Sequence, residues 1–421
     1  MALTQAGAFI GRTDVDVLKY IKFFNETWSV LMQKHDQLPL EGYERSMLTT
    51  WKISYEQVLR QSEAAAWLLR LWAFFHHDDF WYGLLASSGH IAQDIEEFEK
   101  FRLPTWLTDL ASSELEFSSA MGLLKAYSLA DSQGEGSYTM HSVPHQWGRS
   151  LSPEADAASL LSISVCVLAS IAPSEDDNEY WKLDRRLLQH VLHVSDEMGV
   201  KQILEKQQLP ARPISHLGFL LKRQGKLGEA EQMLQRALAS YEKALGPDHT
   251  STLDTVNNLG ILYRAQGKLD EAERMYQHAL AGYEKALGRE ALTIPLLNTV
   301  SNLGLLYSDQ GKLDEAEQMY QRALAGYEKV LGKEALTIPL LNTVNNLGIL
   351  YGDQGKLDEA EWMYQRALAG YESALGPDHM STLGTVNNLG LLYRTQGKLD
   401  EAERMYQRDV TACFASLSAY L

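Results

Sequence analysis

Apolar residues in the second half of the chain recur three or four positions apart, which is the spacing of one face of an α-helix. After the turn Gln266-Gly267-Lys268 this face carries six residues: Ala272, Met275, Tyr276, Ala279, Leu280 and Tyr283. Asp270 lies near the start of this stripe, where a carboxylate suits a helix N-terminus. A shorter apolar stripe, which includes Leu259 and Leu262, precedes the turn. The pattern predicts two helices joined by a tight turn.

This two-helix unit is repeated along the chain. A Gly-Lys-Leu sequence marks each copy, and its leucines are 42, 44, 44 and 42 residues apart: Leu227, Leu269, Leu313, Leu357 and Leu399. One helix pair cannot bury its apolar face alone, so such repeats stack into a superhelix with an extended concave surface. We expect five repeats over residues 211–410 and a divergent tail over 411–421. Asp409 stands where the other copies have alanine, and a truncated array is the expected reason.

The repeat resembles the tetratricopeptide repeat. The family pattern falls on Val256, Leu259, Gly260, Tyr263, Ala272 and Tyr276, with valine at the tryptophan position. Gly260 and Ala272 are small, which lets the paired helices approach closely. The period exceeds the usual ~34 residues, and the sequence "ALGPDH" at 244–249 and 374–379 looks like the kinesin-light-chain subtype. The resemblance implies an all-α fold with a right-handed α-solenoid in this half.

In tetratricopeptide proteins the first helix of each pair lines the concave surface, which implies where this chain binds a ligand. The matching positions form a column of asparagines: Asn258, Asn302, Asn346 and Asn388, with His216 in the first copy. A carboxamide both donates and accepts hydrogen bonds, so these asparagines can hold the backbone of an extended peptide. A structural helix-to-helix hydrogen bond is the alternative.

Two nearly identical copies show which face varies. Residues 255–298 and 299–342 differ at eight of 44 positions, and four differences fall on one face of the first helix. These four are Asn257/Ser301, Ile261/Leu305, Arg264/Ser308 and Ala265/Asp309. Selection for recognition and neutral drift at exposed positions both explain them. The recognition hypothesis adds a peptide-binding surface of mixed charge beside the asparagine column: Asn257, Asn345, Asn387, Arg264, Asp309, Asp353 and Arg394, with Lys222 and Arg223 at its start.

Composition argues against several classes of function. The formal charge of −17 argues against nucleic acid or an anionic membrane as the main partner, because both require a basic surface. No run of 18 apolar residues occurs, and the first 20 residues lack the pattern of a signal peptide. The two cysteines, Cys166 and Cys413, cannot form a disulfide framework. We expect a soluble, cytoplasmic protein whose partner is a protein or peptide.

The first half has another character. Eight of nine tryptophans lie between Trp28 and Trp181, without heptads, which predicts a globular helical core. The sequence His76-His77-Asp78-Asp79 has the composition of a metal cluster, but adjacent residues at a helix end point in different directions. A turn with a helix-starting aspartate is therefore favoured. His141 and His145 are four residues apart, but they lack the glutamate of an H-E-x-x-H zinc site, and Pro144 breaks the helix between them.

Motifs in the first 150 residues resemble, in order, the back half of an NB-ARC nucleotide-binding module. They are "ALTQAGAFI", "LKYIKFFNETW", "TTWKISYEQV", "AAAWLLRLWAFFHHDDF", "LLKAYSL" and "YTMHSVPHQWGR". This is the STAND class of signalling NTPases, in the fungal form that carries tetratricopeptide repeats. The resemblance implies a helical remnant over 1–85, a winged-helix subdomain over 86–152 and a helical connector over 153–210. It also implies that His141 senses the β-phosphate of ADP, although Ser142 replaces the family's aspartate; a packed winged-helix terminus is the alternative.

The phosphate-binding motif of that family, G-x-x-x-x-G-K-[ST], does not occur in the sequence. We therefore expect no cofactor, with ADP or ATP bound only if an upstream nucleotide domain exists. No nucleophile is paired with a base at a recognisable spacing, so we expect no enzyme. The leading hypothesis is a non-enzymatic scaffold or sensor, the ligand-recognition half of an NB-ARC signalling protein, with self-association through the repeats as an option. A kinesin-light-chain-like cargo adaptor is the alternative, although the first half lacks that family's heptads.

Overall fold

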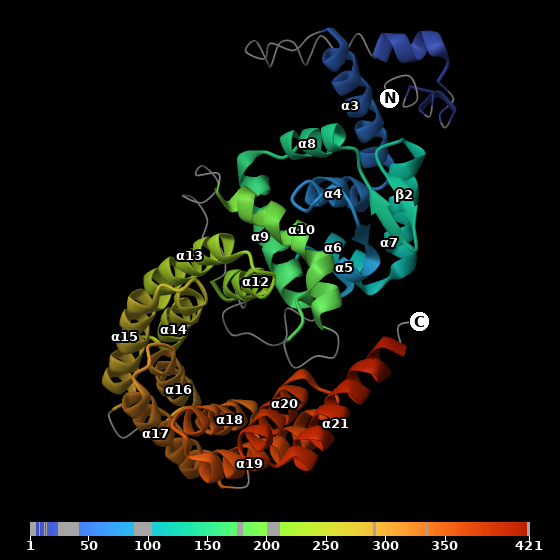
Figure 1. Ribbon diagram of the computed structural model, residues 1–421. Coiled ribbons are helices and arrows are strands. Elements are labelled where there is room, and N and C mark those ends of the chain that lie inside the picture. The colour runs from blue at the N-terminus through green and yellow to red at the C-terminus, as the bar shows by residue number, and fades with distance from the viewer. Residues whose placement is uncertain are drawn as a thin grey trace. The chain divides into compact units, whose positions relative to one another are not determined.

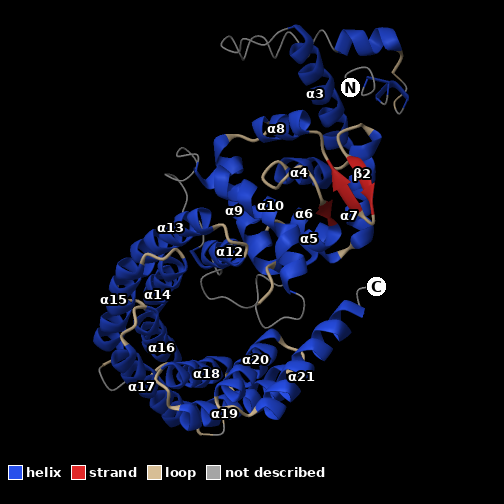
Figure 2. Cartoon of the chain, in the orientation of Figure 1, coloured by secondary structure: helices blue, strands red, loops and turns tan. Residues whose placement is uncertain are grey.

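The computed structural model is almost entirely helical (Figures 1 and 2), which confirms the expected all-α fold with a solenoid of repeats. It describes residues 6–7, 9–11, 13, 15–23, 42–87, 103–174, 180–199, 211–288, 292–333 and 335–418. The chain divides into two compact units: an N-terminal unit of Met1–Pro173 with Trp181–Met233, and a C-terminal unit of Ser174–Tyr180 with Leu234–Leu421. None of the described helices is long and apolar enough to cross a membrane.

In the N-terminal unit, helices pack around an aromatic core. Its helices include α3 (Gly42–Gln61), α4 (Glu63–Trp72), α5 (Tyr82–Ala86), α6 (Thr105–Ser112) and α7 (Glu114–Ala126). Ser62 begins α4, because its side chain accepts a hydrogen bond from the Ala65 N–H at 3.1 Å. Trp72 stacks on Phe80 with 4.7 Å between ring centroids, and both rings are fully buried. Buried rings of this size contribute much of the apolar core.

The unit also contains a three-stranded antiparallel sheet, which is an addition to the expected helices. Its strands β1 (Phe80–Trp81), β2 (Asp131–Gly134) and β3 (Ser137–Thr139) lie in the order β1–β3–β2. The β2–β3 hairpin turns at Glu135-Gly136, where both residues have positive φ. Since β1 precedes residue 86 and pairs with β3, the sheet extends across the expected boundary between residues 85 and 86. The expected domain boundaries stay predictions.

Four further helices complete the N-terminal unit, and a fifth begins in it: α8 (Ser142–Ser150), α9 (Glu154–Ile171), α10 (Tyr180–Gly199), α12 (Ala211–Arg223) and α13 (Leu227–Leu245). Arg223 joins α12 to α10, because its guanidinium bonds both carboxylate oxygens of the fully buried Asp184 at 2.7 and 2.8 Å. Arg223 was expected on the ligand-binding surface. That expectation is wrong, since a buried carboxylate needs a cationic partner and Arg223 supplies it.

The C-terminal unit consists of antiparallel helix pairs. Its first helices are α14 (Thr250–Ala265), α16 (Ile294–Asp309), α18 (Ile338–Asp353) and α20 (Met380–Thr395), and its second helices are α15 (Leu269–Leu287), α17 (Leu313–Leu331), α19 (Leu357–Leu375) and α21 (Leu399–Ser418). Gly267 lies in the turn between α14 and α15 with φ 74°, a conformation that favours glycine. In Figure 1 this unit is a curved array in which α14, α16 and α18 lie on the inner side of α15, α17 and α19.

Helices within a pair touch at glycine. A Cβ built on Gly260 would lie 2.6 Å from Tyr276 Cε1, and one built on Gly348 would lie 2.8 Å from Tyr364 Cδ1. Both tyrosines are buried. The expectation that Gly260 permits close approach of the two helices is confirmed, and the tyrosine ring is what fills the space.

Polar contacts between successive repeats use the same residue types each time. Glu317 in α17 accepts hydrogen bonds from Gln354 Nε2 at 3.1 Å and Lys356 Nζ at 2.9 Å, both in the turn of the next repeat. A second series of ion pairs joins the second helices: Arg322–Glu284, Arg366–Glu328 and Arg408–Glu372. These contacts fix how the repeats stack, and thereby align the first helices beside one another.

Candidate functional site

The first helices of the C-terminal unit each leave one face uncovered. In α18, beyond its first turn, the residues that are exposed or half-exposed are Asn342, Asn345, Asn346, Ile349, Gly352 and Asp353. Their spacing of three and four places them on a single helix face. The remaining residues of the helix are buried against its neighbours. We call this face of α18, with the equivalent faces of α14, α16 and α20, the first-helix strip.

The four asparagines of the predicted column lie on this strip, but their side chains are used differently. Asn302 Nδ2 donates to Asn257 Oδ1 at 3.1 Å, which is a helix-to-helix bond. Asn258, Asn346 and Asn388 are half-buried, and within the described residues their carboxamides have no hydrogen-bond partner. The structural alternative therefore holds for Asn302, whereas the other three retain free donors and acceptors. Their contact with a ligand stays a prediction.

The neighbouring position is mostly used for packing. Asn257 is 8% exposed and accepts the bond from Asn302. Asn345 Oδ1 accepts a hydrogen bond from Thr385 Oγ1 at 3.2 Å, which joins α18 to α20. Of these three predicted contact residues, Asn387 is exposed, Asn345 is half-buried and Asn257 is buried. His216, predicted in the same column, lies on α12 in the N-terminal unit.

The charged residues of the strip form a paired and an unpaired set. Arg264 Nε and Asp309 Oδ2 form an ion pair at 2.5 Å between α14 and α16. Asp353 and Arg394 are exposed, and neither has an ion pair among the residues that the structure describes. The charges of Arg264 and Asp309 therefore neutralise each other, whereas the negative charge of Asp353 and the positive charge of Arg394 are available to a ligand.

An aliphatic column runs beside the asparagines, and two of its members, Ile261 and Leu305, belong to the variable face identified in the sequence. Ile349 is 38% exposed and Leu391 is 46% exposed, and Ile261 and Leu305 hold the equivalent positions in α14 and α16. An apolar side chain on an otherwise polar helix face offers surface that a ligand can cover. The sequence contained the signal, because the four copies in the C-terminal unit have isoleucine or leucine at this position, and the first copy has Phe219.

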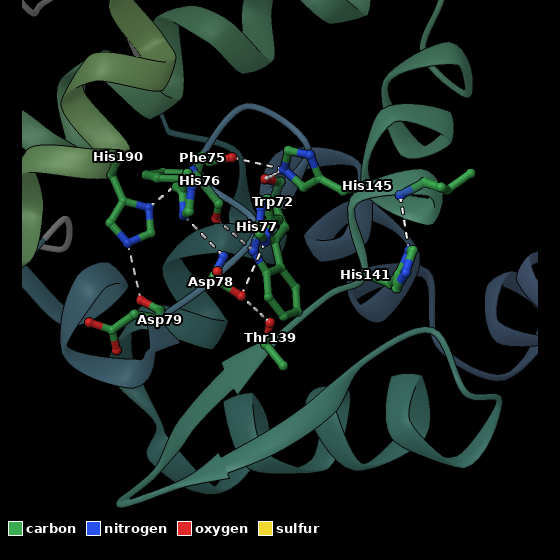
Figure 3. Close-up of polar contacts among 11 residues, drawn as sticks. Trp72, Phe75, His76, His77, Asp78, Asp79, Thr139, His141, His145 and His190 are labelled. Atoms are coloured by element: carbon green, nitrogen blue, oxygen red, sulfur yellow. Dashed lines mark hydrogen bonds and ion pairs between the residues drawn. The ribbon is translucent and has the colours of Figure 1, made fainter. Parts of the chain in front are cut away.

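His141, the predicted nucleotide sensor, lies outside the core of the N-terminal unit (Figure 3). It is exposed, and its Nδ1 accepts a hydrogen bond from the Val143 N–H at 3.4 Å as the N-cap of α8. Pro144 lies in the first turn of α8, where the missing N–H is tolerated. The helix therefore begins after His141 rather than being broken between the two histidines. A nucleotide-sensing role for His141 stays a prediction.

Two other histidines are buried and hold the turn that follows α4. His145 is 3% exposed, and its Nε2 lies 2.8 Å from the Phe75 carbonyl. His190 Nδ1 accepts from the His76 N–H at 3.1 Å, and its Nε2 donates to the Asp79 carbonyl at 3.1 Å. Burial lowers the pKa of both imidazoles to about 4, which outweighs the opposite effect of their bonds to carbonyls. Both rings are neutral near pH 7 and act as structural links.

The turn His76–Asp79 does not start a helix, so that expectation is wrong. Asp78 accepts a hydrogen bond from Thr139 on β3, and Asp79 accepts bonds from Arg186 on α10 at 2.7 and 2.8 Å. The next helix, α5, begins only after β1. These carboxylates hold distant elements together, and their pairing lowers the pKa of both against the opposing effect of burial.

His76, His77 and Asp78 each place a potential metal-ligand atom within 4.8 Å of the other two. Two of the three residues have hydrogen-bond partners in the protein, whereas His77 Nδ1 is buried and makes no hydrogen bond within the described part of the chain. His76 Nδ1 accepts the Asp78 N–H at 3.3 Å, and His77 Nδ1 lies 3.1 Å from Asp78 Oδ1, which accepts from Thr139. Hydrogen bonds of His76 and Asp78 therefore hold this turn.

Comparison with known proteins bears on the repeats. Two models, both described as tetratricopeptide repeat, match residues 211–285 with 339–408, and residues 296–334. No curated protein matches the chain. Among solved structures, BtubC (BKLC) from P. vanneervenii is 24% identical, covering 61% of this chain and 92% of its own, with a TM-score of 0.43.

Two further solved structures are similar. A kinesin light chain of nearly identical TPR-like repeats from Podosopora anserina is 22% identical over 50% of this chain and 98% of its own, with a TM-score of 0.41. A Rap protein complexed with competence and sporulation factor is 14% identical over 78% of this chain and 76% of its own, with a TM-score of 0.47. The segments that the two repeat models match coincide with the helix pairs described above. The solenoid of this chain is therefore built of tetratricopeptide repeats.

Proposed function

We propose that this chain is a non-catalytic interaction scaffold that holds a peptide segment of a partner protein along the first-helix strip. The observation that supports this most is the pair of free carboxamides, Asn346 and Asn388, on two adjacent first helices. Each can accept a backbone N–H and donate to a backbone C=O of an extended chain. The exposed side chains of Ile349 and Leu391 lie on the same strip and offer apolar contact.

Selection from a displayed library of random peptides tests this proposal. Peptides would be selected on the full chain, synthesised with a fluorescent label, and titrated with the wild type and with the double variant Asn346→Ala/Asn388→Ala. We expect the double variant to weaken binding about tenfold or more, since two hydrogen-bonding groups are lost. Gln318→Ala is the matched control, because Gln318 is an exposed amide on the second helix α17. Equal binding by all three proteins would contradict the proposal.

The wider role that we propose is the recognition half of an NB-ARC-type signalling protein. The ordered motifs of the first 150 residues support it, and so does the sheet order β1–β3–β2 with a hairpin that follows α7, an arrangement found in winged-helix folds. ADP binding tests this context. We expect the chain by itself to retain no ADP in equilibrium dialysis, since the sequence has no phosphate-binding loop. Retention that His141→Ala abolishes would show instead that this chain binds nucleotide directly.

We also propose that the protein is cytosolic. Two cysteines in 421 residues do not provide a disulfide framework, and Cys166 is buried and unpaired. Burial raises the pKa of the Cys166 thiol, which makes it an inert core residue.

A further inference from the structure

The four first helices are close copies, yet their strips differ in how far their polar groups are already paired. On α14 and α16, Arg264 pairs with Asp309, and Asn302 bonds to Asn257. On α18 and α20, within the described residues, Asp353, Arg394, Asn346 and Asn388 have no ion pair or hydrogen bond from their side chains. All four helices have the same length and are followed by the same Gln-Gly-Lys turn, so the difference lies in their side chains.

Single residue changes between copies explain the unpaired charge on α18. Asp309 pairs with Arg264, which lies on the preceding first helix. Asp353 on α18 holds the position that Asp309 holds on α16. On the preceding first helix, the position of Arg264 is occupied by Ser308, whose hydroxyl supplies no positive charge. Asp353 is therefore a carboxylate whose cationic partner was replaced. An exposed charge retained without its partner is available for a ligand of opposite charge.

Consecutive free amides occur on one pair of neighbouring helices. Asn258 is also free, but Asn302, which is committed to packing, separates it from Asn346. The helices α18 and α20 touch directly, through the bond from Thr385 to Asn345 at 3.2 Å. Packed helices lie about 8–10 Å apart, and an extended chain advances about 3.3–3.6 Å per residue. Equivalent positions on α18 and α20 are thus about three peptide residues apart.

We infer that α18 and α20 carry the ligand-binding part of the strip, which we call the α18/α20 patch: Asn346, Ile349, Asp353, Asn388, Leu391 and Arg394. This inference rests on the proposed function. Its ligand is an extended peptide segment with a basic side chain at Asp353, an acidic group about three residues away at Arg394, and an apolar side chain over Ile349 and Leu391. On α14 and α16 the side chains of the strip bind one another, through Arg264–Asp309 and Asn302–Asn257, and so align the two helices.

Charge variants of the full chain test the patch. Peptides selected on the wild type are expected to be enriched in a basic and an acidic residue about three positions apart, with an apolar residue close by. Asp353→Lys and Arg394→Glu are each expected to weaken these peptides at least about tenfold, because like charges then face each other. The double variant Arg264→Ser/Asp309→Ala is the matched control, since it removes charges at the same two helix positions where they already pair. We expect it to change affinity less than about twofold.

The outcomes separate the two proposals. Loss of binding in Asp353→Lys and Arg394→Glu, with the control unchanged, supports the patch. If Asn346→Ala/Asn388→Ala weakens binding but the charge variants do not, or if the control weakens it equally, the ligand chemistry inferred here is wrong and the proposed function stands. If no peptide is recovered, or every variant binds as the wild type does, both proposals are overturned. Circular dichroism of each variant establishes that it is folded.

Discussion

At Gly348 the two helices of a repeat leave no room for a side chain. A Cβ there would lie 2.8 Å from the ring atoms Cδ1 and Cε1 of the buried Tyr364, whereas one on Gly352, a turn later in the same helix, would have nothing within 4 Å. We predict that Gly348→Ala destabilises the C-terminal unit by about 1–3 kcal/mol through overpacking. Gly352→Ala is expected to stabilise it by about 0.5–1 kcal/mol, because alanine favours the helix.

Urea unfolding followed by circular dichroism measures both variants. Helix propensity favours alanine at both positions, whereas the contact with Tyr364 exists only at Gly348. The difference between the two variants therefore measures the effect of that contact. Equal stabilisation by both substitutions would contradict the close approach that defines the repeat.

The buried histidines make the N-terminal unit sensitive to acid. The pKa of His145 and of His190 is lowered to about 4 in the folded chain, chiefly by burial, against ~6.5 in an unfolded chain. The unfolded state therefore binds protons first as the pH falls. The stabilising contribution is complete above about pH 7 and is lost between about pH 6.5 and 4, with an upper limit of about 3 kcal/mol for each histidine.

Tryptophan fluorescence reports this transition, because eight of the nine tryptophans precede residue 182. We expect the free energy of unfolding to fall between pH 7 and pH 5, and the fall to be smaller in His190→Gln. The charged groups around the two rings include Arg149, Asp79 and Arg186. Glu197 acts in the opposite direction, since burial raises its pKa and favours the folded state as the pH falls. A free energy independent of pH over this range would show that the rings are not buried as described.

Ion pairs between helices contribute differently to the free energy of unfolding, according to how deeply they are buried. Asp184 is fully buried and holds Arg223, whereas Glu284 and Arg322 join two second helices at the surface. We predict that Asp184→Ala costs about 3 kcal/mol or more, because the largely buried guanidinium of Arg223 then lacks its carboxylate partner. Glu284→Gln is expected to cost less than about 1 kcal/mol, as exposed pairs do. Unfolding curves in urea that gave the two substitutions the same cost would contradict this ranking.

The elements of the repeat region could be predicted, but the pairings between elements could not. The 3-4 spacing of apolar residues and the repeated Gln-Gly-Lys turn locate the helix pairs because they are local signals. The partner of Asp309 is Arg264, 45 residues earlier, and nothing near either residue indicates the pairing. The same holds for the bond between Asn302 and Asn257, which removes one asparagine from a column that looks uniform in the sequence.

The N-terminal unit shows the same limit more strongly. The tryptophans predict a core, but the turn at His76–Asp79 is held by Thr139, Arg186 and His190, from elements more than 60 residues away in the chain. The local sequence alone therefore predicts a helix start at the aspartates, which the structure does not have. His141 and His145 looked equivalent by spacing, yet one is an exposed helix cap and the other is a buried link.

For the molecule as a whole, the proposed function places recognition in the C-terminal unit, whereas the buried histidines of the N-terminal unit have a structural role. Within the C-terminal unit, ion pairs between successive repeats hold the stack, and under the proposed function the first-helix strip contacts the ligand. Stability and recognition therefore depend on different residues of the same helices. Substitutions on the strip should change affinity while leaving the unfolding transition in place.

Hydrogen–deuterium exchange of the full chain, with and without a selected peptide, tests the central claim most directly. Exchange reports local opening, and a ligand that orders a helix slows it there. We predict slower exchange in α18 and α20 on addition of the peptide, and unchanged exchange in α4 and α10 of the N-terminal unit. Slowing confined to the second helices, or to the N-terminal unit, would contradict the claim that this chain recognises its partner through the first-helix strip.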